Sequence, residues 1–399
     1  MKIYQVNVTG RFSTGIIANQ IHSELLKSGH DSRFAFGLGG ETDDRRIMVN
    51  DIWHQRLDSR GQRLTGKQGI FCTRSTEYII NDIKTFQPDL IHLHNLHGNY
   101  LKLEEFLAFL SAYNVPVLLT LHDCWPFTGG CFHFTVNGCN GWKTNCSDCK
   151  FLQHPRIVEK EFRSKRKLFS SIRSLSVVTV SKWLKEVASE SLFKNRDISV
   201  IYNGIDINTF SPQPTDRIRS QLECTDKKVL LGVASSWGRG KGLKTWKDLS
   251  QILGTDYVII LVGLNERQLS ELPTSIIGLP RVQNQNELAE LYSLADVYIN
   301  MSLEETFGLP TIEAMACGTP SIVFRSTANP ELVKEGTGTV CDVFDAVSVA
   351  EAVKTICRNE KKEYSRLCRE YVLSSFSVSN MTRSYLEKYI CILEKDMNR

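Results

Sequence analysis

The amino-acid sequence predicts an α/β protein built from two doubly wound domains in tandem. Its 399 residues exceed what one compact core usually holds and suggest two to three domains. Short apolar runs alternate with helical patterns through both halves of the chain, as in parallel sheets wrapped by helices. Between the halves, residues 203–214 combine turn-forming residues with two prolines, which is typical of a linker.

The first predicted domain covers residues 1–205. Its expected strands are short and apolar, and the segments between them have the spacing of amphipathic helices. The strands are expected at residues 2–8, 33–36, 89–93, 116–121, 176–180 and 198–202. The helices are expected at residues 15–28, 70–86, 101–112, 158–171 and 182–190.

The second predicted domain covers residues 206–379 and repeats this alternation. Its strands are expected at residues 229–234, 257–262, 296–300 and 321–324. Its helices are expected at residues 242–253, 286–294, 310–317 and 347–358. Two more helical patterns follow at 364–373 and 381–393 and could pack on either domain. A tail helix at 380–399 is a candidate to complete the first domain.

Composition excludes several classes of protein. With 42% hydrophobic and 23% charged residues, the chain is expected to be globular, not disordered or fibrous. The net charge of +4 is too small to indicate nucleic-acid binding. No apolar run approaches the ~20 residues of a membrane-spanning helix. The first ten residues alternate like a strand and do not resemble a secretory signal, so we expect a cytoplasmic protein.

The ends of the predicted strands are the places to look for ligands, because open parallel sheets bind them there. The first strand leads into residues 7–15, where Gly15 would let the backbone approach a ligand closely. This segment lacks both G-x-G-x-x-G and the P-loop lysine, so an ordinary strand-to-helix turn explains it equally well.

Residues 304–320 form a more informative connection between a strand and a helix. Pro310 suits a first helical turn and Gly318 a C-cap. Glu305 is then expected in the loop before the helix, and Glu313 about one turn inside it. Two carboxylates beside helix amides suit a ligand with hydroxyls and phosphates. The alternative is one carboxylate that stabilises the helix dipole and a second that is solvated.

Three features in order along the chain resemble the retaining glycosyltransferases of family four. Glu305 and Glu313 stand in the E-x7-E relation of that family. Residues 203–212 resemble its interdomain motif, and residues 181–183 resemble the segment before it. The resemblance covers nearly the full chain and implies the GT-B fold, in which two Rossmann-like domains face each other across a cleft.

The resemblance also implies a binding site for a nucleoside-diphosphate sugar. Glu313 would hold the ribose hydroxyls, and Glu305, as a catalytic residue, would contact the donor sugar. Lys241 would neutralise the departing diphosphate, with Arg239 as a companion cation. The family commonly places that arginine several residues earlier, so Arg239 could equally be a solvated loop cation. The other expected donor-binding residues are Gly15, Thr306, Phe307, Gly308 and Leu309.

The first domain supplies the remaining predicted site residues. His122 follows strand 116–121, where the family has a histidine near the reacting carbon, so we expect it to be catalytic. The alternative is a structural histidine whose hydrogen bonds are satisfied at the end of the strand. The residues expected on the acceptor side are His94, Asn95 and Asp123. The spacing of His92, His94 and His97 also suggests a metal site. The resemblance favours a lining of the acceptor or active site over a metal.

The implied reaction keeps the anomeric configuration of the sugar. The acceptor hydroxyl attacks from the face that the diphosphate leaves, and the diphosphate takes its proton. No cofactor or divalent metal is expected for this chemistry, and we find no Asp-x-Asp at a strand end. We therefore expect a hexosyltransferase that acts on a lipid-linked saccharide in bacterial surface polysaccharide biosynthesis. The alternatives are a sugar-nucleotide epimerase and a noncatalytic sugar-nucleotide-binding protein.

Five of the twelve cysteines lie in residues 124–150, a Cys-rich insert. Four of them have the spacing C-x7-C-x6-C-x2-C, and the closing C-x2-C is a common half of a tetrahedral zinc site. These are Cys131, Cys139, Cys146 and Cys149. We expect them to hold a structural zinc ion; disulfides or unliganded thiols are the alternatives. The insert resembles a subgroup of the family that builds exopolysaccharides such as colanic acid.

Residues 160–173 contain six Lys and Arg side chains interleaved with apolar ones. This segment could dock on an anionic membrane that carries a lipid-linked acceptor, which would place the protein at the inner face of the cytoplasmic membrane. An amphipathic helix that packs on one side and is solvated on the other explains the pattern equally well.

Overall fold

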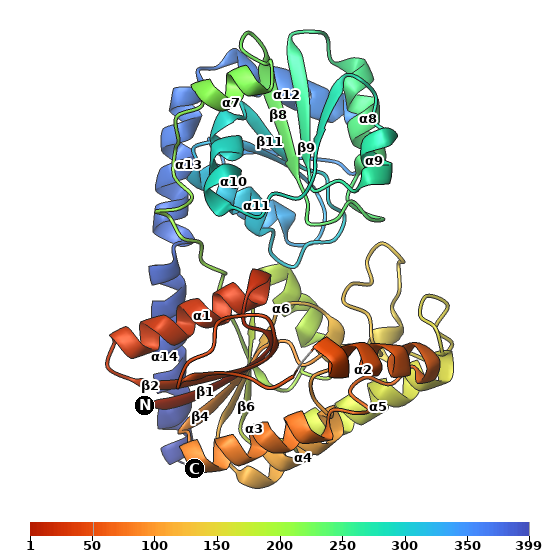
Figure 1. Cartoon of the computed structure of the whole chain (residues 1–399), viewed down its shortest axis with the longest axis vertical. Coiled ribbons are helices and arrows are strands. Elements are labelled where there is room, and N and C mark those ends of the chain that lie inside the picture. Colours follow the sequence, from red (N-terminus) through yellow and green to blue (C-terminus); the bar gives the residue numbers. More distant parts are fainter. Residues whose placement is uncertain (51, 399) are drawn as a thin grey trace. The chain divides into compact units, whose positions relative to one another are not determined.

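The computed structural model describes residues 1–50 and 52–398 and divides into two compact units (Figure 1). Unit 1 consists of residues 1–202 and the C-terminal segment that begins at Met381, and unit 2 consists of residues 203–380. The sequence places these boundaries at 205/206 and 379/380. Each unit is built on one parallel sheet, so the predicted fold class is confirmed.

Unit 1 contains a seven-stranded sheet in the order β3-β2-β1-β4-β5-β6-β7. Its central strands are almost entirely buried, as is typical of parallel sheets that helices cover. The strands are β1 (Lys2–Thr9), β2 (Asp31–Leu38), β3 (Arg46–Met48), β4 (Leu90–Leu93), β5 (Val117–Leu121), β6 (Leu175–Thr179) and β7 (Asp197–Val200). The helices are α1 (Phe12–Lys27), α2 (Ile52–Thr65), α3 (Thr73–Phe86), α4 (Leu103–Tyr113), α5 (Pro155–Ser171), α6 (Lys182–Ser189) and the C-terminal α14 (Val378–Met397), with short 3₁₀ turns at Trp125–Phe127 and Gly141–Lys143.

The C-terminal helix α14 contributes to the core of unit 1. Its Tyr385 and Tyr389 are fully buried. They belong to one apolar cluster with Ile3 of β1, Ile21 of α1 and Leu118 of β5. The tail of the chain therefore completes a core whose other members lie in the first half of the sequence.

Unit 2 contains a six-stranded sheet in the order β10-β9-β8-β11-β12-β13. All of its strand pairs are parallel. The strands are β8 (Lys228–Val233), β9 (Tyr257–Val262), β10 (Ile276–Leu279), β11 (Val297–Asn300), β12 (Ser321–Phe324) and β13 (Gly338–Cys341). The helices are α7 (Asp216–Gln221), α8 (Leu243–Ile252), α9 (Glu266–Ser270), α10 (Gln285–Leu294), α11 (Leu309–Ala316), α12 (Ala346–Arg358) and α13 (Lys361–Ser375), with a 3₁₀ turn at Asn329–Leu332.

Residues 203–214, which the composition predicts to be a linker, are anchored within unit 2. Ile205 and Phe210 are buried. The guanidinium of Arg369 in α13 donates hydrogen bonds to the carbonyls of Ile207 and Phe210. The turn-forming composition therefore marks an ordered segment of this unit.

The sequence pattern misses several elements, and their size explains most of these misses. The strands β3, β10 and β13 have three or four residues, and α7 and α9 have six and five, which is too short for a clear periodicity. The longer helix α2 is missed because its sequence is mostly polar and contains Gly61.

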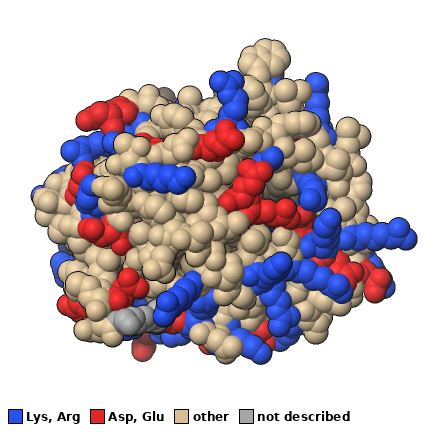
Figure 2. Space-filling view, turned by 90° about the horizontal axis from the view of Figure 1, so that it is seen from below, with Lys and Arg blue, Asp and Glu red and all other residues tan. Residues whose placement is uncertain are grey.

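Helix α5 carries most of the predicted basic segment. Of the six cations in residues 160–173, Lys165 is buried, and Arg163 is exposed but pairs with Glu159. The other four are exposed, namely Lys160, Arg166, Lys167 and Arg173. On the face drawn in Figure 2, Lys and Arg side chains are interspersed with Asp and Glu. Within the part of the chain that the structure describes, no helix combines the length and the apolar character needed to cross a bilayer.

Candidate active site

In unit 2, Lys241 and Glu305 form an ion pair at the ends of two adjacent strands. Nζ of Lys241 lies 2.6 Å from Oε1 of Glu305 and donates to Oγ of Ser302 at 3.0 Å. Lys241 follows β8 and Glu305 follows β11, and these strands pair in parallel. Both side chains therefore emerge at the same edge of the sheet. Each is partly exposed to solvent.

A glycine next to Lys241 permits this approach. Gly242 precedes α8 with a φ of +74°, and a Cβ at this position would lie 2.5 Å from Cβ of Met301. Glycine alone tolerates both the angle and the contact. The amide of Leu303 donates to the carbonyl of Gly240 at 2.7 Å, which holds the two loops together.

Helix α11 begins shortly after Glu305, and its N-cap residue, Gly308, makes no side-chain capping hydrogen bond. Gly308 precedes the helix with a φ of +101°, and Pro310 lies in the first turn. Uncapped amides at a helix N-terminus favour anions. Among the neighbouring residues predicted to bind the donor, Phe307 is buried, while Thr306 and Leu309 are half-buried.

Glu313 lies one turn inside α11 and is half-buried. Its Oε2 accepts a hydrogen bond from the hydroxyl of Tyr292 at 2.9 Å. Burial raises the pKa of Glu313 to about 7, and the hydrogen bond from Tyr292 opposes that rise. Glu313 is therefore not the solvated helix residue of the alternative interpretation. Near pH 7 its carboxyl group can both accept and donate hydrogen bonds.

Two other residues predicted to bind the donor have different surroundings. Arg239 is exposed, and it takes part in none of the ion pairs among residues 1–50 and 52–398. Gly15 lies where α1 passes the end of β1, and a Cβ there would come 2.8 Å from the carbonyl oxygen of Thr9. The close approach of the chain's own backbone is therefore enough to require glycine at this position. The preceding Phe12 and Ser13 have positive φ angles, so α1 begins in a strained conformation.

In unit 1, His94 and His122 are buried and hydrogen-bonded to each other. Nδ1 of His94 lies 3.0 Å from Nε2 of His122, and the two rings are stacked. Nε2 of His94 lies 3.2 Å from Oε1 of Gln5 on β1. His94 therefore fixes the orientation of the predicted catalytic histidine.

A second layer of this network reaches the C-terminal helix. Nε2 of His92 lies 2.8 Å from Oγ1 of Thr120, and its Nδ1 lies 2.7 Å from the hydroxyl of Tyr389. The hydroxyl of Tyr385 is 3.1 Å from the same threonine oxygen. The rings of His92 and His94 are 4.0 Å apart, so the two layers are in contact.

Burial lowers the pKa of these histidines. The pKa of His122 falls to about 4; Asp123 raises it and His97 lowers it, but burial is the largest cause. Burial also holds the pKa values of His92 and His94 well below 6.5. All three imidazoles are therefore neutral at pH 7, and His122 acts there as a neutral hydrogen-bonding group.

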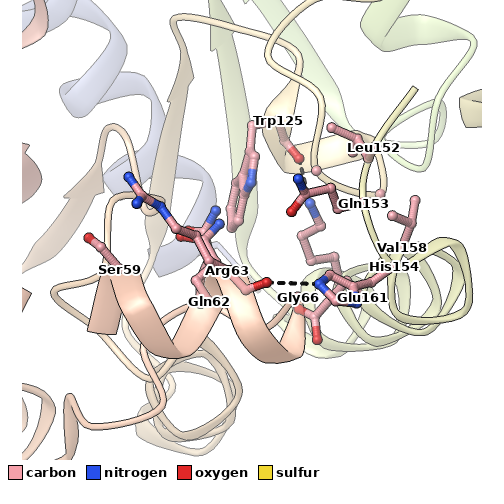
Figure 3. Close-up of a pocket in the computed structure, with 14 residues that line it drawn as sticks. Ser59, Gln62, Arg63, Gly66, Trp125, Leu152, Gln153, His154, Val158 and Glu161 are labelled. Carbon is pink, nitrogen blue, oxygen red and sulfur yellow. Dashed lines mark hydrogen bonds between the residues drawn. The ribbon is translucent and has the colours of Figure 1, made fainter. Parts of the chain in front are cut away.

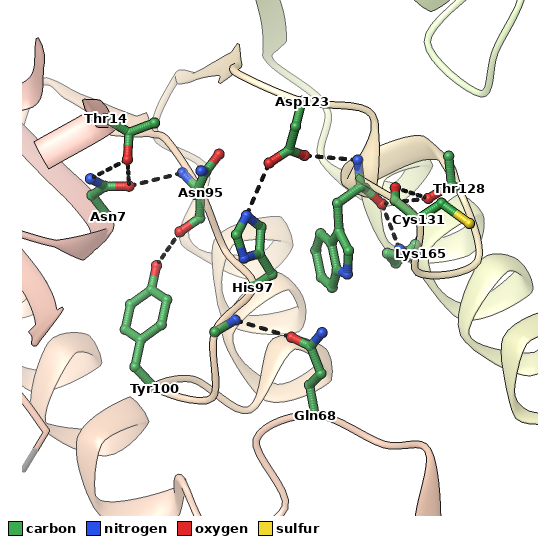
Figure 4. Close-up of polar contacts among 12 residues, drawn as sticks. Asn7, Thr14, Gln68, Asn95, His97, Tyr100, Asp123, Thr128, Cys131 and Lys165 are labelled. Carbon is green, nitrogen blue, oxygen red and sulfur yellow. Dashed lines mark hydrogen bonds and ion pairs between the residues drawn. The ribbon is translucent and has the colours of Figure 1, made fainter. Parts of the chain in front are cut away.

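Asp123 and Asn95 are fixed by neighbouring polar groups (Figure 4). Oδ2 of Asp123 lies 3.0 Å from Nε2 of His97, and its Oδ1 accepts a hydrogen bond from the amide of Trp125 at 2.8 Å. The amide of Asn95 donates to Oδ1 of Asn7 at 3.1 Å. The residues predicted on the acceptor side are thus immobilised at the ends of β4 and β5.

The four cysteines predicted to bind zinc are free thiols, and none of them forms a disulfide. They are Cys131, Cys139, Cys146 and Cys149. Burial, together with the neighbouring thiols, raises the pKa of Cys131 to about 12 and that of Cys146 to about 11. Among the described residues, no group of three or more His, Cys, Asp or Glu side chains has the arrangement of a metal site. The zinc site therefore stays a prediction, and no metal arrangement is found at the histidines.

Sequence reasoning missed several residues that support the site. Tyr385 and Tyr389 come from the distant C-terminal helix, and no local pattern connects them to His92. The sequence contained a signal for Gln5, because this polar residue lies between Tyr4 and Val6 in a strand that is expected to be buried. The sequence also contained a signal for Lys165, because helical spacing puts it on the same side of α5 as the buried Phe162 and Phe169.

Two family models match the chain and together span nearly all of it. The model described as Glycosyltransferase Family 4 matches residues 16–209. The model described as Glycosyl transferases group 1 matches residues 215–372. The first match covers most of unit 1, and the second contains Lys241, Glu305 and Glu313 of unit 2.

Curated relatives and a solved structure agree with these matches. The putative colanic acid biosynthesis glycosyl transferase WcaC of Escherichia coli is 24% identical over 98% of this chain and 99% of its own length. The N-acetyl-alpha-D-glucosaminyl L-malate synthase of Bacillus anthracis is 27% identical over 56% of this chain, a match that covers 61% of that protein. The crystal structure of Anabaena Alr3699/HepE in complex with UDP superposes with a TM-score of 0.68 over 98% of this chain and all of that one, at 17% identity.

The family matches, the full-length relative and the two parallel-sheet units agree on one assignment. The solved structure shares the fold, and the relative that spans the whole chain is a glycosyl transferase by name. The chain therefore belongs to the GT-B glycosyltransferases, with a family 4 segment in its N-terminal part and a group 1 segment in its C-terminal part.

Proposed function

We propose that this glycosyltransferase transfers a sugar, with retention of configuration, from a nucleoside diphosphate to a saccharide acceptor in bacterial surface polysaccharide biosynthesis. The observation that carries the proposal is the pair Lys241–Glu305 just ahead of the uncapped amides of α11. An ammonium and free amides suit a diphosphate, and a carboxylate suits sugar hydroxyls. UDP in the Anabaena structure makes uridine nucleotides the first donors to test.

In the proposed reaction, the bond between the anomeric carbon and the diphosphate oxygen breaks, and its electron pair stays on the diphosphate. The acceptor oxygen bonds to the same face of the sugar, and its proton passes to the departing diphosphate. Ser302 and Glu305 accept two hydrogen bonds from Lys241, so one N–H of its ammonium is left for a diphosphate oxygen. That contact strengthens as negative charge develops, which lowers the barrier.

The other proposed roles follow from the surroundings of each residue. Glu305 contacts the donor sugar, and Glu313 hydrogen-bonds the ribose with a carboxyl group that Tyr292 orients. His122 is the proposed catalytic histidine, a neutral imidazole that His94 holds in place. A divalent metal is not required in this scheme, because Lys241 and the amides of α11 stabilise the leaving group.

The acceptor is proposed to be a lipid-linked saccharide. The full-length similarity to a protein named for colanic acid biosynthesis supports this class of acceptor. The exposed cations of α5 would then contact an anionic membrane surface at the inner face of the cytoplasmic membrane. Each exposed Lys or Arg near such a surface contributes about 1 kcal/mol. Cosedimentation with phosphatidylserine vesicles that is lost in an Arg166→Gln/Lys167→Gln variant would support this contact.

We also propose a structural zinc ion at the Cys-rich insert. The C-x7-C-x6-C-x2-C spacing of the four cysteines supports it. Four thiolates would leave no open position, so the metal would order the loop and take no part in transfer. Metal analysis of protein purified without chelators should find one zinc per chain. A Cys146→Ser/Cys149→Ser variant should lose it and a Cys391→Ser control should keep it; less than one zinc in the unchanged protein refutes the site.

The donor site is tested by thermal shift with UDP-, GDP- and ADP-sugars. A true donor at 100 times its Kd stabilises the folded state by about 2.7 kcal/mol. We expect one nucleotide series to raise the Tm, and a Lys241→Ala variant to lose that response while the exposed Lys354→Ala control keeps it. No response to any nucleotide sugar would contradict the site. Transfer that depends on added acceptor excludes an epimerase, which isomerises its substrate alone.

A further inference from the structure

Unit 1 contains a cavity of about 470 Å³ that the proposed reaction does not use (Figure 3). Its walls come from α2, from the loop after β5 and from α5. The volume lies within the range of pockets that bind small molecules. Four of the polar side chains that line it are Gln62, Arg63, Glu161 and Lys165, and Trp125 forms part of its wall.

Lys165 is the unusual member of this lining, because only 1% of it is exposed. Lysine is almost never fully buried unless it is paired. Its Nζ donates to the carbonyl of Trp125 at 2.6 Å and lies 3.8 Å from the centroid of the indole ring. No carboxylate among the described residues lies within ion-pair distance of it. In the charged form of Lys165, one hydrogen-bond acceptor leaves two of its three N–H groups for an occupant of the cavity.

The neighbouring amide side chains also present donors. Oε1 of Gln62 accepts from Nδ2 of Asn99 at 2.8 Å, and Oε1 of Gln68 accepts from the amide of Gly98 at 3.1 Å. Their carbonyl oxygens are therefore occupied, while no acceptor among the described residues contacts either NH₂ group. Together with the guanidinium of Arg63, these groups give the cavity an excess of donors over its one carboxylate, Glu161. Burial lowers the pKa of Lys165 to about 7, so a bound anion would favour its charged form.

The cavity is also connected to the predicted acceptor residues. Trp125 accepts from Lys165 through its carbonyl and donates to Asp123 through its amide (Figure 4). Asp123 follows His122 in the chain and binds His97. A group bound at Lys165 is thus two hydrogen bonds from the carboxylate beside the proposed catalytic histidine.

We propose that this cavity is a subsite for an anionic sugar residue of the acceptor saccharide. The anion contacts Lys165 and Arg63, and the amides of Gln62 and Gln68 donate to the sugar hydroxyls. An aromatic wall with a few convergent donors is the usual lining of a site for a small polar ligand. The assignment rests on the proposed function, because it takes the cavity's occupant to be part of the acceptor.

The experiment measures binding of single sugars to the full chain by ligand-observed NMR. Glucuronate and glucose 6-phosphate are the anionic probes, and glucose is the neutral one. We expect at least one anionic probe to bind at least about tenfold more tightly than glucose, because charge-assisted hydrogen bonds are the strong ones. The probe that binds identifies the anion as a carboxylate or a phosphate.

Three variants localise the site. Arg63→Gln and Lys165→Met should each weaken the anionic probe about tenfold, whereas Arg60→Gln on the exposed side of α2 should not change it. Arg63 is exposed, so Arg63→Gln still tests the subsite if the buried Lys165 proves necessary for folding. Equal binding of glucose and both anions, or unchanged binding in Arg63→Gln and Lys165→Met, overturns the subsite. Donor thermal shifts depend on unit 2 and would survive that result, which separates this failure from a failure of the proposed function.

Discussion

Both units have polar residues at the ends of parallel strands, but these residues are charged and partly exposed in unit 2 and neutral and buried in unit 1. In unit 2, Lys241 and Glu305 stay partly exposed and face each other as an ion pair. In unit 1, His94 and His122 are buried, and burial lowers their pKa values. An exposed pair can exchange partners when an anion arrives, whereas a buried network holds its geometry. The strand ends of unit 2 are therefore suited to binding charge, and those of unit 1 to fixing positions.

The largest expected effect comes from removing the cation of unit 2. Lys241→Ala should lower kcat by about 100- to 1,000-fold, the usual cost of losing one group that stabilises developing negative charge. Lys241→Arg should restore part of the rate, because it restores the charge. Steady-state kinetics with the donor found by thermal shift provide the measurement. The Lys354→Ala control, on the exposed side of α12, should match the unchanged enzyme. A loss of less than about tenfold in Lys241→Ala would remove this residue from the mechanism.

A smaller effect is expected from protonating the histidines of unit 1. The folded pKa of His122 is about 4, below the value of about 6.5 for an unfolded histidine, so the unfolded chain binds more protons between these values. The stability contributed by neutral His122 is therefore fully present above about pH 6.5 and is lost as the pH falls toward 4. This amounts to about 3 kcal/mol, and His92 and His94 act in the same direction.

Urea unfolding of unit 1 at a series of pH values measures this dependence. A His94→Gln variant removes one of the buried imidazoles and should flatten the curve between pH 6.5 and 4. His54→Gln, a change at an exposed histidine, is the matched control for the effect of replacing a histidine. A free energy of unfolding that rises on acidification would show that these histidines are charged in the folded protein.

The smallest effect is expected from removing the hydrogen bond between the C-terminal helix α14 and the buried histidines of unit 1. Tyr389→Phe removes only the hydroxyl that binds Nδ1 of His92 and should cost about 1 to 2 kcal/mol, because a buried polar atom loses its partner. Tyr364→Phe makes the same change at a half-exposed position of unit 2 and should cost close to nothing. Denaturant unfolding compares the two. Equal costs would mean that the tyrosine hydroxyl does not support His92.

The sequence predicted the parts of the fold and the site that depend on local pattern. The alternation of apolar runs and helical spacing predicted two parallel-sheet units, and both are present. Glycine and proline placed the start of α11 correctly to within a residue, since Pro310 lies in its first turn. The mostly polar α2 was missed, and with it one wall of the cavity in unit 1.

Lys165 shows where local reasoning about charge failed. In the sequence it belongs to a run of cations, and charge alone would place it on the surface with Arg166 and Lys167. Helix periodicity instead places it between Phe162 and Phe169 on the buried side of α5. Its partner, the carbonyl of Trp125, lies 40 residues away in the chain. The partner of a buried charge depends on packing, which a local pattern does not contain.

The sequence by itself determined which chemical groups stand at the ends of the strands. Periods of two and of about 3.6 residues are local properties, and they fixed the strand ends at which His122 and Glu305 lie. Only the tertiary structure decided which groups meet and which are charged. His92 binds a tyrosine 297 residues away, and Lys241 binds a glutamate 64 residues away. Burial, which sets the pKa of His122 and of Glu313, is a property of the packed unit, because desolvation depends on every neighbouring element.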